Sequence, residues 1–421
     1  MKLPNLTKTH IIACVTAIVA AILAVVIVLI CVLYPPVDIV FSSGGVSNAQ
    51  SVVESIPEII TSSEEETIIS SEEVPVSSDT SSITSKPLTP VPPIQTTPTD
   101  LTSVTPMSSR HPVPEDSDTF DITLSFTGDM ILATNKDTHY SGALREYAAT
   151  RDPSYFLEKV RHIFEADDFT ISNVENVFSD RALTPVYKDY SPAFWFIAPS
   201  SNINILAGSG IEGAMIANNH IRDYGQEGYN DSVAAITNAG MQYGDASRIM
   251  YFEKGGYVIS VICSGMWGEY QANNIINLMK TAQQHSHYQV VIFHGGTEKI
   301  HEPEEWKRRA ARKLVDNGAD LVVGGHPHVL QPREVYNGVE IIYSIGNFCY
   351  GGHRYPENRT VIYQMTLTVG KDMTLRSSSS NIIPCYVYTG SINNFQPAIV
   401  DDETIKNRIL DFMNGLIPSP V

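Results

Sequence analysis

The feature that most constrains the fold of this chain is a set of short apolar runs that each end in polar side chains capable of chemistry. Residues 211–216 form one such run, which leads into Asn218, Asn219 and His220 and is followed by Asp223. Four further runs end in residues of the same kind: Asp129; Asn173 and Glu175; His294 and Glu298; and His326 and His328. Apolar runs of this length are typical of buried strands. Because ligands bind where the strands of an open α/β sheet end, these side chains are predicted to form one site.

Helical patterns between these runs complete an α/β domain, which is predicted to extend over residues 119–421. Asp152 and Pro153 predict the start of a helix that continues through Phe164, with Asp152 as its N-cap. Residues 304–317 predict a charged amphipathic helix. Three cysteines of the domain are expected to be buried free thiols, namely Cys263, Cys349 and Cys385.

An unbroken apolar run near the N-terminus covers residues 11–33. As a helix it would be roughly 35 Å long, enough to cross a hydrocarbon core of about 30 Å. Lys2 and Lys8 precede it, so residues 1–10 are expected in the cytoplasm and the domain outside the cell, held to the cell membrane by this single transmembrane helix. A cleaved signal peptide is the alternative, but the run is longer than the apolar region of a signal peptide and no small-residue cleavage site follows it.

The segment after this run, residues 42–118, is rich in Ser, Thr, Pro and Glu. Such a composition cannot bury enough apolar surface to offset the loss of chain entropy on folding, so the segment is predicted to be a disordered stalk. The formal net charge of the whole chain is −18, and no basic patch stands out in the sequence. These features argue against nucleic acid as a partner.

The mixture of side chains at the strand ends suits divalent cations. Carboxylate and amide oxygens together with imidazole nitrogens favour Mn, Fe or Zn, and a pair of such ions can promote an in-line displacement at phosphorus. One carboxylate would have to bridge the two ions, and Glu175 is the candidate. One histidine would have to stay free to protonate the leaving oxygen, and His220, beside Asn219, is placed for this role. Asp223 and Glu298 are candidates for acceptors that orient the ligands.

Each motif also has a purely structural interpretation. The Asn-Asn-His sequence could be a polar turn that caps backbone amides, and His294 alone could be a histidine of the core. His326 and His328 flank Pro327, and alternate residues of an extended segment point to opposite sides. Both rings can face one site only if the segment bends here; otherwise they could be two loop histidines that cap a helix.

An ordered series of motifs runs through the domain. It consists of Gly128-Asp129, Asn173-x-Glu175, Ala217-Asn218-Asn219-His220, Asp223-Tyr224-Gly225, His294-x-Gly296-x-Glu298, His326-Pro327-His328-Val329-Leu330-Gln331-Pro332 and Tyr343-Ser344-Ile345-Gly346-Asn347-Phe348. This series, which covers roughly residues 122–350, resembles the CapA/PgsA family of capsule and poly-γ-glutamate synthesis proteins. That family is similar in turn to the calcineurin-like metallophosphoesterases, which implies a four-layer α/β/β/α sandwich with a two-metal site.

The resemblance implies roles for individual residues. The positions that match ligands of two divalent ions are Asp129, Glu175, Asn219, His294, His326 and His328. His220 matches the general acid, with Asp223 as its catalytic neighbour. The positions expected to contact the substrate or the ligands are Asn173, Glu298 and Asn347. The chain departs from the metallophosphoesterase pattern at Ile131, where a histidine is usual, and at Asn173-x-Glu175, where a Gly-Asp-x-x-Asp motif is usual. It departs from the capsule-family pattern at Gly295 and Lys299, which replace Trp and Tyr.

Two functions are compatible with these residues. The first is a membrane-anchored hydrolase that uses metal ions to cleave a phosphoester or amide linkage in envelope polymer metabolism. The second is a non-enzymatic accessory subunit of a capsule polymer synthase or exporter, in which the site binds metal or polymer. The expected partners are membrane subunits of the capsule or polyglutamate synthase and an anionic envelope polymer. A basic strip at Lys307-Arg308-Arg309 and Arg312-Lys313 could contact that polymer, but a solvated helix face is the preferred interpretation.

Overall fold

The structure is a computed structural model that describes residues 105–352 and 357–421. The predicted segments 1–10 and 11–33, and most of the predicted stalk 42–118, lie outside these residues. Among the helices of the described part, none is long and apolar enough to cross a membrane. All described residues belong to one compact unit of the chain.

One large sheet has seven strands in the order β1-β9-β10-β11-β12-β14-β13. Their bounds are β1 (Met107–Ser108), β9 (Met250–Lys254), β10 (Tyr257–Gly265), β11 (Tyr288–His294), β12 (Leu321–Gly325), β13 (Leu330–Tyr336) and β14 (Val339–Ile345). The central strands β10, β11, β12 and β14 are parallel, so their carboxyl ends lie at one edge of the sheet. Every residue of β11 is buried, as is usual for a parallel strand covered on both faces.

The second large sheet has eight strands, seven in the order β18-β17-β16-β2-β4-β7-β8 and β15 paired with β2. Their bounds are β2 (Thr119–Ile131), β4 (Phe169–Val174), β7 (Gly213–Met215), β8 (Gln242–Gly244), β15 (Asn347–Tyr350), β16 (Thr360–Gly370), β17 (Leu375–Tyr386) and β18 (Ala398–Ile399). Strands β2, β4, β7 and β8 are parallel, whereas β16 and β17 are antiparallel to their neighbours. A small third sheet consists of β3 (Thr134–Asn135), β5 (Val177–Phe178) and β6 (Phe196–Ala198).

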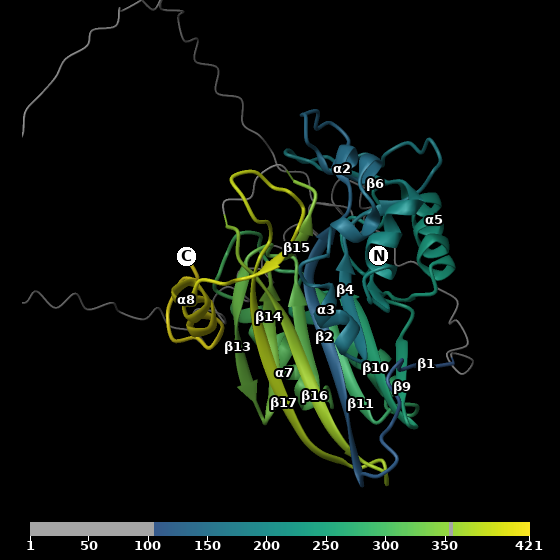
Figure 1. Cartoon of the computed structure of the whole chain (residues 1–421), viewed down its shortest axis with the longest axis vertical. Coiled ribbons are helices and arrows are strands. Elements are labelled where there is room, and N and C mark those ends of the chain that lie inside the picture. The colour runs from purple at the N-terminus through teal and green to yellow at the C-terminus, as the bar shows by residue number, and fades with distance from the viewer. Residues whose placement is uncertain (1–104, 353–356) are drawn as a thin grey trace, which may run out of the picture. The chain divides into compact units, whose positions relative to one another are not determined.

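Helices cover the outer faces of the two large sheets, except for the last helix, which packs against β13 and β17 and contributes to the core between the sheets. The α-helices are α2 (Leu144–Thr150), α3 (Arg161–Ala166), α4 (Asn204–Ala207), α5 (Gly225–Asn238), α6 (Ala272–Ala282), α7 (Glu305–Asp316) and α8 (Glu403–Met413). Short 3-10 turns are η2 (Pro153–Tyr155), η3 (Ser200–Ile203) and η4 (Glu269–Gln271). Figure 1 shows the long strands β2, β16 and β17 side by side and α8 beside β13.

Three apolar clusters show how the layers are stacked. In the first, Phe126 of β2 packs with Val261 of β10, so the inner faces of the two large sheets share one core. In the second, residues of α2, α3, α4 and α5 pack on the outer face of the eight-stranded sheet. In the third, residues of α6 and α7 pack on the outer face of the seven-stranded sheet. The predicted α/β class is therefore confirmed, and the layers follow one another as helices, sheet, sheet and helices.

The folded domain begins before the predicted boundary at residue 119. Met107 pairs with Phe252 in the parallel strands β1 and β9, and both Met107 and Val113 pack against the core between the sheets. The backbone N–H of Ser109 also donates to the carbonyl of Glu253 at 2.8 Å. The stalk prediction was therefore wrong for this part of residues 42–118, because a few apolar side chains and ladder hydrogen bonds suffice to attach a polar segment to an exposed sheet edge.

The helix predicted from Asp152 is interrupted. The Asp152 carboxylate does accept the backbone N–H of Ser154 at 2.9 Å, but the turn that it caps is only the 3-10 turn η2. The α-helix α3 starts at Arg161, and the buried side chains of Phe156 and Leu157 in between pack into the helix-side core. Tertiary packing here overrides the local capping signal. The predicted buried free thiols of Cys263, Cys349 and Cys385 are confirmed.

The basic strip of α7 does not form a uniformly solvated face. Arg308 and Arg312 pair with Glu334, and Arg309 pairs with Glu269. Lys307 is fully buried and donates to Gln331 Oε1 at 2.8 Å. The interpretation as a solvated face was therefore wrong for Lys307, whose ammonium group lies inside the domain.

Burial of Lys307 predicts an unusual pH dependence of stability. Burial lowers the pKa of Lys307 to about 7, from an ordinary value of 10.5. Between these values the unfolded chain binds more protons than the folded protein, so the free energy of unfolding rises with pH. Relative to a Lys307→Met variant, wild type should gain about 1.4 kcal/mol of stability per pH unit above pH 7. Urea denaturation at pH 7, 8 and 9 measures this difference.

The exposed Lys280 of α6 provides the control, since a Lys280→Met variant should follow wild type at every pH. A stability difference between wild type and Lys307→Met that stays constant from pH 7 to pH 9 would contradict the prediction.

Candidate metal centre

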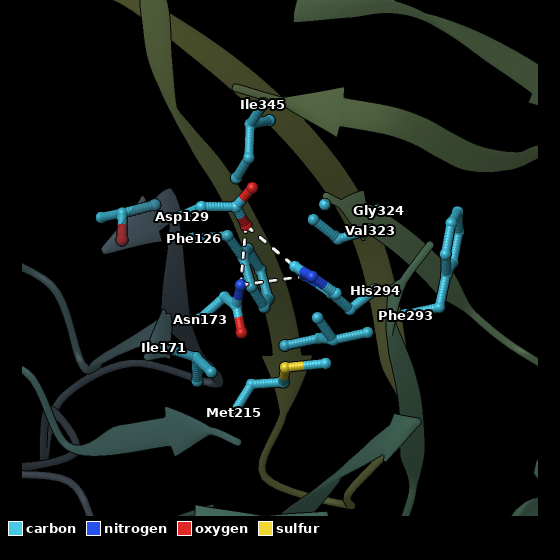
Figure 2. Close-up of a pocket in the computed structure, with 13 residues that line it drawn as sticks. Phe126, Asp129, Ile171, Asn173, Met215, Phe293, His294, Val323, Gly324 and Ile345 are labelled. Carbon is cyan, nitrogen blue, oxygen red and sulfur yellow. Dashed lines mark hydrogen bonds and ion pairs between the residues drawn. The ribbon is translucent and has the colours of Figure 1, made fainter. Parts of the chain in front are cut away.

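The predicted site residues come together where strands of both large sheets end. Asp129 lies near the end of β2, and Glu175 directly follows β4 in the same sheet. From the other sheet, His294 is the last residue of β11, and His326 follows β12. Figure 2 shows Asp129, Asn173 and His294 pointing toward one another across the junction of the sheets. The site therefore lies at the carboxyl edge that both parallel strand sets share.

Asp129 is the central acceptor of this cluster. Asn173 Nδ2 donates to its Oδ1 at 2.7 Å, and the backbone N–H of His326 donates to its Oδ2 at 3.0 Å. A Cβ atom at Gly325 would lie 2.7 Å from Oδ1, so this close approach requires glycine. Burial by itself raises the pKa of Asp129, but the hydrogen bond with His328 and the charges of His294 and His328 outweigh it and hold the pKa well below its usual value. Asp129 is therefore an anion at neutral pH.

Glu175 is fully buried, and neither of its carboxyl oxygens has a hydrogen-bond partner within the described residues. His294 Nε2 lies 3.3 Å from Oε1, while the Nε2 atoms of His220 and His328 each lie 3.9 Å from it. Burial raises the pKa of Glu175 to about 8, against the opposite effect of the His328 charge. Because buried polar groups normally form hydrogen bonds, a carboxyl group surrounded by imidazoles without any is a candidate cation ligand.

The segment that carries His326 and His328 is bent, as is required for both imidazole rings to face one site. His326 has a φ of 94° and His328 a φ of 59°, a left-handed backbone that is uncommon outside glycine and costs about 1–3 kcal/mol per residue. The ring centroids of these histidines are 5.6 Å apart, and the His326 ring lies 4.7 Å from that of His294. Such strain is typical of functional sites, where the surrounding structure maintains it.

The protonation states of these rings differ. Burial lowers the pKa of His294 to about 3 and that of His326 to about 2, so both are in the neutral form that metal binding requires. For His328, burial also favours the neutral form, but the charge of Glu175 and the hydrogen bond with Asp129 raise the pKa to about 9. His328 Nδ1 lies 3.0 Å from Asn347 Oδ1, which fixes the ring while Nε2 faces Glu175.

Two groups of side chains have the arrangement of a metal site. Within each group, the possible ligand atoms lie within 4.8 Å of one another. One group consists of Asp129, Glu175 and His294, and the other of Glu175, His326 and His328. Glu175 is common to both. Asn219 Oδ1 adds an oxygen 2.8 Å from His294 Nε2. This mixture of carboxylate, amide and imidazole groups suits a divalent transition metal.

His220 and Asp223 form a hydrogen-bonded pair at the side of this cluster. His220 Nδ1 lies 2.8 Å from Asp223 Oδ2, and its Nε2 faces Glu175. Asp223 is buried and also accepts the backbone N–H of Phe196 at 2.8 Å. The Phe196 ring meets the His220 ring edge-on, with centroids 4.7 Å apart. The imidazole is thus held in one orientation by Asp223 and Phe196.

The other predicted residues differ in how closely they approach the cluster. Asn173 Nδ2 lies 3.1 Å from His294 Nδ1 in addition to its bond with Asp129. Asn347 is buried against His328. Glu298 is exposed and, within the described residues, forms no hydrogen bond or ion pair with the ligand groups, although its charge adds to the raised pKa of His328. Glu298 is therefore a residue of the rim.

Three residues of the site received no role from the sequence. Lys188 pairs with Asp223 Oδ1 at 2.6 Å. Asn218 donates to Asn173 Oδ1 at 3.0 Å and accepts the backbone N–H of His220 at 3.1 Å, so the polar-turn interpretation holds for this residue of the motif. The Trp267 ring lies edge-on to the His326 ring, with centroids 4.6 Å apart. Trp267 could have been found, because it closely follows the apolar residues that form β10; Lys188 carries no such signal.

The sequence matches a family model described as bacterial capsule synthesis protein PGA_cap over residues 123–351. The PGA biosynthesis protein CapA of Bacillus subtilis (strain 168) is 29% identical over 270 residues, which cover 58% of this chain and 68% of that protein. The capsule biosynthesis protein CapA of Bacillus anthracis is 25% identical over 323 residues, covering 68% of this chain and 72% of that protein. A probable polyglutamine synthesis accessory protein of Mycobacterium tuberculosis (strain ATCC 25618 / H37Rv) is 23% identical over 190 residues, covering 36% and 50%.

Two solved structures from Thermus thermophilus are similar at a lower level. A 5′-nucleotidase precursor has a TM-score of 0.35 and 14% identity, covering 62% of this chain and 54% of that chain. The protein TT1561 has a TM-score of 0.34 and 11% identity, covering 62% of this chain and 99% of that chain. At these TM-scores neither structure defines the fold of this protein.

Proposed function

Because this chain belongs to the PGA_cap family of bacterial capsule synthesis proteins, we propose that it serves the synthesis of a polyglutamate-type capsule polymer and carries a metal-dependent hydrolase site. The names of its relatives support the pathway, since two are capsule or PGA biosynthesis proteins and one is a probable polyglutamine synthesis accessory protein. The bond cleaved would be a phosphoester or an amide of an envelope polymer or its precursor.

The observation that carries the hydrolase proposal is the environment of Glu175. Its carboxyl group is buried without hydrogen bonds and belongs to both candidate ligand groups. A carboxylate in this position fits between two divalent ions, for which Mn, Zn or Fe are the candidates. The ions would be held by the two groups together with Asn219, and all six predicted ligands are thereby used.

The residues of the chain supply binding and proton transfer. When bound, the metal ions would polarise the scissile group and lower the pKa of a water molecule. His220 donates the proton that the leaving oxygen or nitrogen needs, from the Nε2 atom that faces the cluster. Asp223 accepts the Nδ1–H of His220 and so orients the ring with its Nε2 atom toward the cluster. Lys188 and the backbone N–H of Phe196 hold Asp223 in place.

The proposal includes an anchor in the cell membrane. Residues 11–33 would cross the membrane once and leave the domain outside the cell, beside the membrane subunits of a polymer synthase and the anionic polymer. The length and apolar composition of this run support the anchor. Fractionation of cells that produce the full chain, compared with a chain lacking residues 11–33, tests it; recovery of both forms in the same fraction would contradict the anchor.

The test of the hydrolase is made on the full chain. Bound Mn, Fe and Zn are quantified per chain, and hydrolysis of bis(p-nitrophenyl) phosphate and of γ-glutamyl p-nitroanilide is followed before and after chelation. We expect about two ions per chain and turnover that chelation removes and metal restores. Bound metal without turnover of either probe would favour a non-enzymatic accessory subunit, a role that the name of the mycobacterial relative supports. A chain that binds no metal would overturn the site.

A further inference from the structure

A cavity of about 370 Å³ adjoins the metal centre on the side of Trp267. Its lining includes Ala217 and Asn218, which lead to the candidate ligand Asn219, and the indole ring of Trp267. That ring is in edge-on contact with His326, and 43% of the Trp267 residue surface is exposed. The volume lies at the small end of the range of about 300–1,000 Å³ that small-ligand pockets occupy. The cavity is therefore large enough for a short unit of a polymer whose scissile bond lies at the metal centre.

The lining of this cavity also includes a guanidinium group, that of Arg222. Arg222 follows His220 by two residues, and its Cζ lies 4.3 Å from the centroid of the Tyr229 ring. Its Nη1 donates to Gln226 Oε1 at 2.5 Å. Within the described residues no carboxylate pairs with Arg222, unlike the arginines of α7. Stacking on Tyr229 and the bond to Gln226 thus hold the guanidinium ready while most of its donors remain available.

The acidic residue of the cavity does not compete for Arg222. Asp245 Oδ1 accepts the backbone N–H of Ser247 at 2.7 Å and its hydroxyl at 2.8 Å. Asp245 Oδ2 accepts the hydroxyl of Tyr229. Both oxygens are thus used within the wall, where they fix the tyrosine on which Arg222 stacks.

We propose that this cavity is the substrate subsite, in which Arg222 binds a carboxylate of a γ-linked glutamate unit and Trp267 packs against the methylene groups of the chain. The planar guanidinium binds a carboxylate through two parallel hydrogen bonds, and an aromatic face packs well against an apolar stem. This contact also explains how an acidic protein can bind an acidic polymer. The single positive charge of Arg222 attracts the polymer carboxylate, so a large basic patch is not required. The choice of glutamate rests on the proposed function; the requirement for an anion rests on the cavity alone.

Binding to the full chain tests the subsite without relying on turnover. The dissociation constant of a γ-linked glutamate pentamer is measured by calorimetry, with and without Mn. The same pentamer with its carboxylates converted to amides, and an oligomer of glycerol phosphate, serve as the comparison ligands. For Arg222→Met we expect the dissociation constant of the acidic pentamer to rise about 10–100-fold, the loss of one charge-assisted contact. Arg222→Lys should recover part of this loss, since an ammonium group cannot bind in the two-pronged mode.

Arg151 provides a matched control, because it also stacks on tyrosine rings, at 5.3 Å from the centroid of Tyr155, but lies outside this cavity. Arg151→Met should bind the pentamer as wild type does. The subsite is overturned if wild type does not bind the acidic pentamer, or if Arg222→Met binds it as tightly as wild type. It is also overturned if Arg222→Met weakens binding of the amide form as much as binding of the acidic pentamer. Tighter binding of the glycerol phosphate oligomer would overturn the glutamate assignment. None of these outcomes depends on hydrolysis, so failure of the subsite and failure of the hydrolase are distinguishable.

Discussion

A Glu175→Gln variant is expected to lose metal binding at both ligand groups and, with it, about 10³-fold or more of the hydrolytic rate. Glu175 is the only residue common to the two groups, and both of its oxygens are free of hydrogen bonds within the described part of the chain. A neutral amide presents one oxygen instead of a shared negative charge, so it cannot serve two cations. Elemental analysis of the purified variant measures this directly.

The melting temperature provides an independent test of whether Glu175→Gln loses metal binding. At a free metal concentration of about 100 times the dissociation constant, binding should stabilise wild type by about 2.7 kcal/mol. Glu175→Gln should show no such rise in melting temperature.

The control for this variant is Glu298→Gln, which removes a nearby carboxylate that is exposed at the rim. It should keep its metal and its metal-dependent rise in melting temperature. A Glu175→Gln protein that still binds two ions per chain would contradict the assignment of Glu175 as the shared ligand.

A His220→Ala variant is expected to keep its bound metal and lose about 10²–10⁴-fold in kcat, the usual contribution of a general acid. His220 belongs to neither candidate ligand group, although its Nε2 faces the cluster at 3.9 Å from Glu175 Oε1. Its Nδ1 is engaged by Asp223. KM should change little, because the proton is transferred to the leaving group only in the transition state.

Substrates with different leaving groups refine this experiment. A leaving group of low pKa needs little protonation. The decrease in kcat caused by His220→Ala should therefore be smaller for p-nitrophenyl esters than for alkyl esters. His162→Ala, which removes an exposed histidine of α3, is the control and should match wild type. Loss of metal from His220→Ala would make His220 a ligand, and unchanged kcat with alkyl esters would exclude it as the acid.

The sequence was sufficient to predict the α/β class and the residues that meet at the strand ends. Buried parallel strands such as β11 are continuous apolar runs, and this pattern is visible in a single chain. Parallel strands also place their carboxyl ends at one edge, so polar residues that follow them are brought together. The structure brings Asp129, Glu175, His294 and His326 into one cluster for this reason.

Local signals failed where distant contacts decided the outcome. Asp152 does cap a turn, as predicted, but the buried side chains that follow this turn interrupt the helix. The polar composition of residues 42–118 concealed Met107 and Val113, which attach the end of this segment to the domain. Lys307 lies in a basic run, and only the packing of α7 against the sheet buries it.

The sequence by itself determined which chemical groups meet, because strand periodicity and the polar residues at strand ends are local properties of the chain. Only the tertiary structure decided how these groups are held. The pairing of Lys188 with Asp223 and the contact of Trp267 with His326 each join segments that are far apart in the chain. The left-handed backbone of His326 and His328 is maintained by the structure around it. Orientation and burial of a side chain depend on atoms that its neighbours in sequence do not supply, and the pKa values and unsatisfied oxygens that characterise the site follow from that burial.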